Sequence, residues 1–214
     1  MRAIFLLLAA SAACLGADFF AGAMGGVATL SADAQTVATP PNQFSAYKPQ
    51  NGAVFQVFGG SHFTDYFSAQ LSYGWNRNAV TLNGADVARQ ASYEAPMRAT
   101  MHSLVAEGMV YFRPRASRIR PYLAAGPGLS ILRAASKGPV ALSGPIAAPD
   151  ARIESTRPAL RVAVGIDVRL SGGLRFRYSF SETLQRNALS RALRPPAQRN
   201  LANFQNLWGV SWEF

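Results

Sequence analysis

The last twelve residues alternate between two kinds of side chain. The even positions from 204 to 214 carry Phe, Asn, Trp, Val, Trp and Phe, and the odd positions from 203 to 213 carry Asn, Gln, Leu, Gly, Ser and Glu. Successive side chains of a β-strand point to opposite faces, so this pattern predicts a strand with one aromatic and one small or polar face. Aromatic groups in a row on a water-exposed terminal strand would invite aggregation. The pattern therefore favours a strand that faces lipid on one side and a polar interior on the other.

The N-terminal segment has the features of a secretory signal. Arg2 precedes a mostly apolar stretch over residues 3–30, and the A-x-A sequence Ala32-Asp33-Ala34 follows it. One positive charge, an apolar run and small residues before a cleavage point are typical of a signal peptide. We therefore predict a signal peptide over residues 1–34 and a mature N-terminus at Gln35.

Two alternatives concern the same segment. A signal anchor would keep it in place, but many Ala and Gly residues dilute the apolar run and the A-x-A sequence follows it. Lipidation of Cys14, the only cysteine, would make the chain a lipoprotein, although Ser11 stands where such sites usually carry Leu. Cleavage after Ala34 would leave a mature chain without cysteine, which needs no disulfide.

Composition limits the available partners. Removing 34 of the 214 residues would leave 180, which is enough for one domain. The formal net charge of the full chain is +10, and almost all of its 21 basic residues are arginines. Basic charge is compatible with nucleic acid, but an exported chain seldom meets it, so we predict no nucleic-acid partner. Arginine also binds phosphate and carboxylate in a bidentate manner, which suits phosphate-bearing lipids outside and carboxylates inside.

Several further segments alternate with period two. The clearest are 66–76, 159–170 and 174–181, and weaker ones are 53–61, 101–112 and 119–131. The alternation predicts these lipid-facing side chains: Phe67, Leu71, Leu160, Val164, Ile166, Phe176 and Trp208. It predicts these inward ones: Gln70, Glu107, Asp167, Arg175 and Arg177. A soluble β-sandwich would use the same strands, but the secretory signal and the aromatic end of the chain favour a membrane barrel.

The connections and the strand count suggest how the barrel closes. Connections 62–65, 113–118 and 171–173 are short, whereas 77–97, 132–155 and 182–201 are long. This alternation is typical of short periplasmic turns and long external loops. Only seven strands are clear, and a bacterial single-chain barrel should have an even number. We therefore predict an all-β, antiparallel, eight-stranded transmembrane barrel over residues 51–214, with a weak first strand at 42–49 in the N-terminal segment 35–50.

Residues 50–214 resemble the outer-membrane β-barrel family with an outer-membrane-protein-A/X-type transmembrane domain. The segments TDYFSAQLSYGWN, VYFRP, RPYLAAGPGL and WGVSWEF carry the resemblance. It implies insertion in the outer membrane of a Gram-negative cell envelope and recognition of the aromatic terminus by the barrel-assembly machinery. The residues that would form this assembly signal are Trp208, Val210, Trp212 and Phe214. The poor first strand departs from the family, and we expect no peptidoglycan-binding domain after the barrel.

The interior of an eight-stranded barrel is just wide enough for its own side chains. Desolvated charges need partners, so the inward charged residues should pair across this lumen. The predicted ionic network consists of Glu107, Arg161, Asp167, Arg169, Arg175 and Arg177. A narrow, porin-like pore for small solutes or ions is the alternative function.

A lipid-modifying enzyme is the third possibility. His102, Ser103 and Glu107 lie on one predicted strand, but His102 and Ser103 point to opposite faces and cannot share a proton directly. The second histidine, His62, falls in a short turn, on the wrong side for outer-leaflet chemistry. We expect an interfacial or solvated side chain at both histidines. We predict no catalytic residue, metal site or cofactor.

The last long loop is densely basic, with Arg186, Arg191, Arg194 and Arg199 around Pro195-Pro196. Solvated arginines are one interpretation, and contact with outer-membrane lipid and lipopolysaccharide phosphates is the other. We therefore predict a monomeric, non-enzymatic outer-membrane barrel with a structural or surface-interaction role.

Overall fold

A computed structural model describes residues 18–31, 36–38, 43–196 and 200–214. The strands of its N-terminal half are β1 (Asp18–Leu30), β2 (Thr36–Ala38), β3 (Gln43–Pro49), β4 (Gly52–His62), β5 (Phe67–Asp86) and β6 (Ala91–Tyr111). They are followed by β7 (Ile119–Ser136), β8 (Ala141–Ser143), β9 (Arg152–Ser171), β10 (Leu174–Arg186), the helix α2 (Ala188–Ala192) and β11 (Asn200–Glu213). No helix in these ranges is long and apolar enough to span a membrane.

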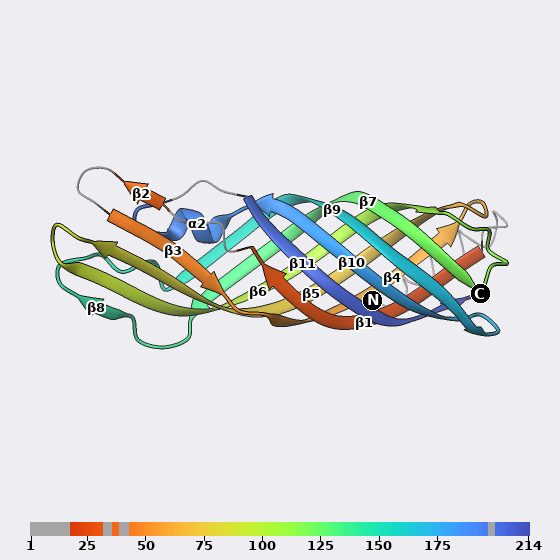
Figure 1. Ribbon diagram of the computed structural model, residues 1–214, viewed down its shortest axis with the longest axis horizontal. Coiled ribbons are helices and arrows are strands. Elements are labelled where there is room, and N and C mark those ends of the chain that lie inside the picture. Colours follow the sequence, from red (N-terminus) through yellow and green to blue (C-terminus); the bar gives the residue numbers. More distant parts are fainter. Residues whose placement is uncertain (1–17, 32–35, 39–42, 197–199) are drawn as a thin grey trace, which may run out of the picture.

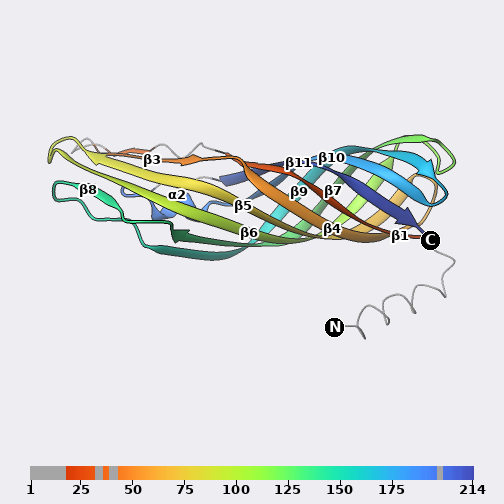
Figure 2. The ribbon, with the colours of Figure 1, turned by 90° about the horizontal axis from the view of Figure 1, so that it is seen from below.

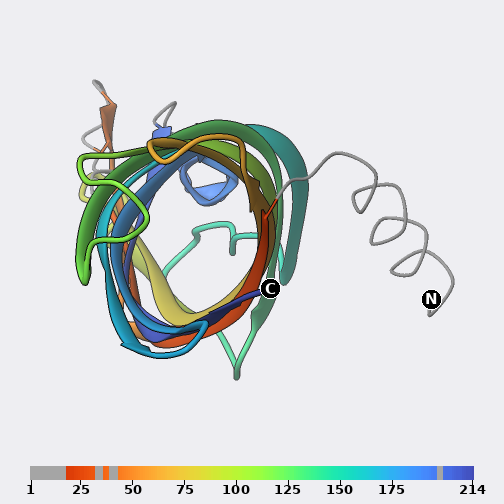
Figure 3. The same ribbon diagram turned by 90° about the vertical axis from the view of Figure 1, so that its right-hand side faces the viewer.

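In the described part of the chain, eight strands form a closed antiparallel ring. Its order is β1, β4, β5, β6, β7, β9, β10 and β11, and β1 closes it by pairing with both β4 and β11. The strands cross the long axis obliquely (Figure 1), and an end-on view shows the ring (Figure 3). Closure leaves the ring without an unpaired edge, which an open sheet would expose. The predicted all-β, eight-stranded barrel is confirmed.

The predicted faces of the strands are also confirmed. The side chains of Phe67, Leu71, Leu160, Val164, Phe176 and Trp208 are exposed on the outside of the ring, and that of Ile166 is half-buried there. Gln70, Glu107, Asp167, Arg175 and Arg177 are buried inside it. Period-two alternation determined both sets, because a slip of one residue would have exchanged the faces.

The first strand is not where the sequence predicted it. β1 (Asp18–Leu30) occupies the first position of the ring, inside the segment expected to be a signal peptide. The segment 42–49 was expected to be that strand. Its described part is β3, which pairs only with β2 and with the far half of β5, outside the ring. Residues 1–17, including Cys14, and Ala34 itself lie outside the described residues.

The sequence pattern did not reveal β1 as a strand because β1 has no polar face. Its buried side chains, Phe20, Met24, Ala28 and Leu30, are apolar, and its outer positions are mostly small. Phe20, Met24 and Ala28 pack with Phe58 and other apolar side chains inside the ring. Without polar residues at alternate positions, the strand cannot be distinguished by its sequence from the apolar part of a signal peptide.

We therefore expect the mature chain to retain Asp18–Leu30. Cleavage after Ala34 would remove β1 and leave β4 and β11 as unpaired edges. Intact-mass measurement of protein from outer-membrane fractions should give an N-terminus at or before Asp18. A mature chain that begins at Gln35 would contradict this prediction.

The end of the barrel that carries the long connections, called the loop end below, also differs from the prediction. The expected long loop 77–97 is mostly strand, because β5 and β6 continue as a paired hairpin whose turn spans only 87–90. These strands have 20 and 21 residues, about twice the 9–11 that a tilted strand needs to cross a bilayer. β3 and β8 pair with the far halves of β5 and β6. The sheet thus continues past the ring as an extension (Figure 2).

Candidate functional site

The lumen of the ring is the first candidate site, and its lowest layer lies near the short turns. Arg175 Nε lies 2.6 Å from Glu213 Oε1, and the side chain of Arg175 is buried. Arg120, fully buried, donates from Nη2 to the Asp65 backbone carbonyl at 2.7 Å, and its guanidinium lies 3.8 Å from the centroid of the Tyr111 ring. A carboxylate from the last strand thus binds an arginine from β10 beside an arginine from β7.

The middle layer centres on Arg177. Its Nε and Nη2 donate to the two oxygens of Asp167, each at 2.6 Å, and its Nη1 donates to Gln70 Oε1 at 2.8 Å. Tyr111 donates its hydroxyl to Asp167 Oδ2 at 3.0 Å, and the Arg177 guanidinium lies 4.6 Å from the Phe58 ring centroid. This geometry is a bidentate, charge-assisted pair, the stronger kind of ionic hydrogen bond.

The upper polar layer centres on Arg161 and Glu107. Arg161 Nε lies 3.6 Å from Glu107 Oε1, and its Nη2 donates to Gln56 Oε1 at 2.9 Å and to Ser181 Oγ at 3.0 Å. Ser72 Oγ donates to Glu107 Oε2 at 3.1 Å. The strands that contribute these groups surround the lumen, so the layer crosses its full width.

Five of the six residues predicted for the ionic network lie in these layers. The exception is Arg169, which is half-buried and donates from Nη2 to the Arg115 backbone carbonyl at 2.5 Å. Three residues near the short turns were not predicted for the network: Arg120, Glu213 and His62, whose Nε2 lies 3.1 Å from Glu213 Oε1. Period two could have identified Arg120, on the face of β7 opposite the apolar Ile119 and Leu123, and Glu213, on the polar face of the last strand.

A cluster of buried apolar side chains, here called the apolar plug, lies at the loop end of the barrel. The helix α2 follows Asn187, whose side-chain oxygen accepts from the Ser190 backbone N–H at 3.0 Å and so caps the helix. Leu189 and Leu193 are fully buried among apolar side chains of the surrounding strands, including Leu82 of β5 and Met97 of β6. In the end-on view α2 lies within the outline of the ring (Figure 3). The loop expected to be solvated thus supplies part of a core.

The plug also includes the buried side chain of Tyr93, which contacts the last loop. The Arg194 backbone N–H donates to the Tyr93 hydroxyl at 3.1 Å, in the part of β6 that lies beyond the ring. Burial raises the pKa of Tyr93. The hydroxyl therefore stays neutral, which suits its apolar surroundings.

His62 is buried, which corrects the expectation of an interfacial or solvated side chain. Its Nδ1 lies 2.6 Å from Ser68 Oγ, and its Nε2 lies 3.1 Å from Glu213 Oε1. A serine, a histidine and a carboxylate in hydrogen-bond contact have the composition of a hydrolytic triad. Here the serine is 4 % exposed, the carboxylate also binds Arg175, and the Phe20 ring lies 4.7 Å from the imidazole centroid. The hydroxyl therefore belongs to a buried residue, and the carboxylate is shared with a guanidinium.

The other sequence candidates lie on the surface. Arg186, Arg191 and Arg194 of the predicted basic loop patch are exposed, and Arg199 lies outside the described residues. The imidazole of His102 faces outward and lies within hydrogen-bond distance of the Tyr73 hydroxyl, at 2.7 Å, while Glu107 faces the lumen. In the described ranges no group of three or more His, Cys, Asp or Glu side chains could hold a metal ion.

The terminal strand exposes its aromatic face. Trp208, Val210 and Trp212 are 47–49 % exposed, and Phe214 is 75 % exposed. The Phe214 backbone N–H donates to the Phe19 carbonyl at 2.9 Å, so the last residue is tied to β1 by its backbone. Recognition of these side chains by the assembly machinery stays a prediction.

Deleting Phe214 should lower the amount of barrel in the outer membrane but scarcely change its stability. The side chain is mostly exposed, so its removal costs little buried apolar area. The variant, refolded in detergent, should unfold at nearly the same urea concentration as the parent. A collapse of refolded stability with normal membrane insertion would instead make Phe214 a packing element.

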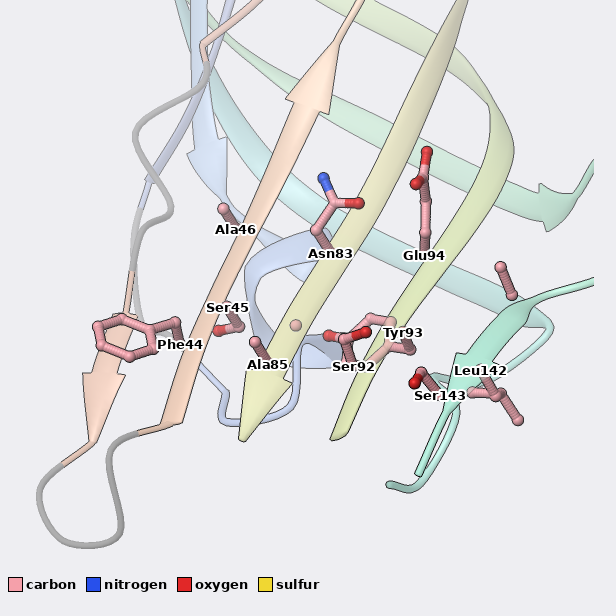
Figure 4. A pocket seen from close by; sticks show the side chains of 12 residues that line it. Phe44, Ser45, Ala46, Asn83, Ala85, Ser92, Tyr93, Glu94, Leu142 and Ser143 are labelled. Atoms are coloured by element: carbon pink, nitrogen blue, oxygen red, sulfur yellow. The ribbon is translucent and has the colours of Figure 1, made fainter. Parts of the chain in front are cut away.

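A surface groove lies on the outer side of the extension. It has a volume of about 600 Å³ and lies across β3, β5, β6 and β8. In Figure 4, Phe44 stands at one side and Leu142 at the other, with Ala85 and Ser92 between them and Glu94 nearer the barrel. Phe44 and Leu142 are 43 % and 54 % exposed. The groove thus combines two apolar walls, a floor of small residues and one carboxylate.

Comparisons with known proteins agree with this geometry. The neisserial surface protein A structure is 15 % identical, with a TM-score of 0.57 over 92 % of this chain and 97 % of that one. The structure of the outer membrane protein OprG from Pseudomonas aeruginosa is 13 % identical, with a TM-score of 0.55 over 92 % and 96 % of the two chains. No curated protein matches the sequence. The family described as outer membrane protein beta-barrel domain matches residues 3–214, and the chain therefore belongs to this family of small outer-membrane barrels.

Proposed function

We propose that the protein is a monomeric, non-enzymatic outer-membrane barrel that holds a surface extension outside the cell. The observation that carries the proposal is the filled lumen. Three layers of paired arginines and carboxylates cross it, and the apolar plug around Leu189 and Leu193 covers its loop end. A lumen occupied by its own side chains supports a structural or surface role over transport.

The extension supports the surface-interaction part of this proposal. In outer-membrane barrels the short turns face the periplasm and the long connections face outward. This rule supports an external position for the far halves of β5 and β6. The groove between Phe44 and Leu142 is then open to the medium. Exposed apolar side chains beside a hollow are typical of contact surfaces.

Single-channel recording tests the proposal against the pore alternative. The purified full chain in planar bilayers should show no reproducible conductance steps, while a general porin under the same conditions should show them. Steps that change in ion selectivity when Glu107 is replaced by Gln would pass through the lumen, because Glu107 is buried inside it. That result would overturn the sealed-barrel proposal.

Thiol labelling tests the direction of the extension. In a Cys14→Ser background, Leu142→Cys and Ala116→Cys place single thiols at exposed positions near opposite ends of the barrel. A membrane-impermeant maleimide should label intact cells that carry Leu142→Cys and should label Ala116→Cys only after lysis. The reverse result would place the extension in the periplasm.

The enzyme alternative has one observation in its favour, the contact of Ser68, His62 and Glu213. The burial of the serine and the binding of the carboxylate by Arg175 support a structural role instead. A serine-reactive fluorophosphonate should therefore leave the folded protein unlabelled. Labelling that is lost in Ser68→Ala would favour the enzyme.

A further inference from the structure

A second groove, distinct from the lumen and from the groove on the extension, lies on the outer wall of the barrel. It has a volume of about 640 Å³ and lies where β6, β7 and β9 run side by side. Four of its lining residues are cationic and one is acidic: Arg98, Arg133, Lys137 and Arg152 against Glu154. Thr100 and His102 add polar groups. The predicted loop patch contains none of these arginines.

Strand register explains why the cations gather here. Arg98 of β6 and Arg152 of β9 both pair with Ala135 of β7, one from each side. Neighbouring strands are about 4.8 Å apart, so the two arginine backbones stand about 10 Å apart across a small residue. In the next row Arg133 lies between Thr100 and Glu154. The result is a hollow whose floor is the small residue Ala135, with a guanidinium group on each side.

The cations in this groove are poorly compensated. Glu154 Oε1 lies 3.9 Å from Arg133 Nε and 4.0 Å from Arg152 Nε, at the limit of an ion pair. The side chains of all three residues are more than half exposed, so these contacts add little stability. Like charges on adjacent strands repel one another. An anion with several oxygen atoms would relieve this repulsion and accept bidentate hydrogen bonds.

The position of the groove identifies the kind of anion. On β6 the outward residues change from Leu104 through His102 to Arg98, and on β7 they change from Leu129 to Arg133. The apolar side belongs to the lipid-facing belt, and the first arginine stands two outward positions later on β7 and three later on β6. In an outer-membrane barrel this boundary lies at the loop end, at the level of the outer-leaflet headgroups.

We propose that the groove between β6, β7 and β9 binds the phosphate groups of an outer-leaflet lipid whose headgroup carries two phosphates, as in lipid A. Arg98 and Arg152 hold phosphate from the two sides of Ala135, and Arg133 approaches from the row nearer the membrane. The acyl chains then lie along the apolar belt below. This inference rests on the proposed surface role and makes it specific, and it does not depend on whether the lumen conducts.

Native mass spectrometry of the full chain in uncharged detergent tests the inference. The probes are bisphosphorylated lipid A, monophosphorylated lipid A and inorganic pyrophosphate. The bisphosphorylated lipid should bind most tightly. The triple variant Arg98→Gln/Arg133→Gln/Arg152→Gln should lose affinity for it by about tenfold or more, because several charge-assisted hydrogen bonds are removed. Glu154→Gln should raise the affinity, because it removes the competing carboxylate.

A matched control variant removes three arginine charges from the last loop instead of from the groove. Arg186→Gln/Arg191→Gln/Arg194→Gln alters the exposed loop patch and should keep affinity within about twofold of the parent. Heat-modifiable gel mobility should be equal for both triple variants, since all six side chains are exposed. An equal loss in the two variants, or no loss in the first, would overturn the site. Pyrophosphate binding as tight as that of the lipid would overturn the lipid assignment. None of these outcomes alters the conductance test of the sealed lumen.

Discussion

Replacing Asp167 by Asn is expected to lower the free energy of unfolding by about 3–5 kcal/mol. The substitution keeps the size of the side chain but leaves the Arg177 guanidinium, which is buried at 1 % exposure, without its negative partner. Both ionic hydrogen bonds of 2.6 Å become weaker at once. The cost is large because the charge cannot reach water from within the filled lumen.

Urea unfolding in detergent, followed by tryptophan fluorescence, measures this cost. Glu154→Gln is the matched control, because it removes one carboxylate from an exposed ion pair and should change stability by only about 0–1 kcal/mol. Asp167→Leu with Arg177→Met removes both charges and should recover much of the loss. If Asp167→Asn and Glu154→Gln had equal effects, Arg177 would reach solvent and the lumen could not be sealed.

Replacing Leu193 by Ala is expected to destabilise the protein by about 2–5 kcal/mol, the usual cost of a cavity in a packed core. Leu193 is fully buried, and it belongs to the apolar plug together with Leu189 and side chains of β5 and β6. A solvated loop would not show this sensitivity. The prediction therefore tests whether the last long connection is part of the core.

The same urea assay measures the effect, with Leu142→Ala as the control. Leu142 is the same residue type, but it is 54 % exposed on β8, so its truncation should change stability by about 0.5 kcal/mol or less. Equal and small effects of both substitutions would mean that α2 does not pack inside the barrel.

The sequence by itself determined which side of most strands meets lipid. Leu160 and Asp167 on β9, or Phe176 and Arg177 on β10, have opposite preferences for lipid and for a polar interior, and the two-residue period assigns each to its face. This local pattern was sufficient to predict the barrel, the short turns and five residues of the lumen network.

Only the tertiary structure decided which segments close the ring and which partners meet across it. β1 needed no polar face because Phe20 and Met24 pack against side chains from distant strands, so the local pattern concealed it. The sequence predicts a loop at the far half of β5, whereas its apolar residues Val80 and Leu82 are buried and belong to the same core cluster as Leu189. The pairing of Arg161 with Glu107 depends on the stagger of eight strands around the barrel. Such contacts join residues that are far apart in the chain. Closure of the ring brings these residues together, and no local segment of the sequence encodes that closure.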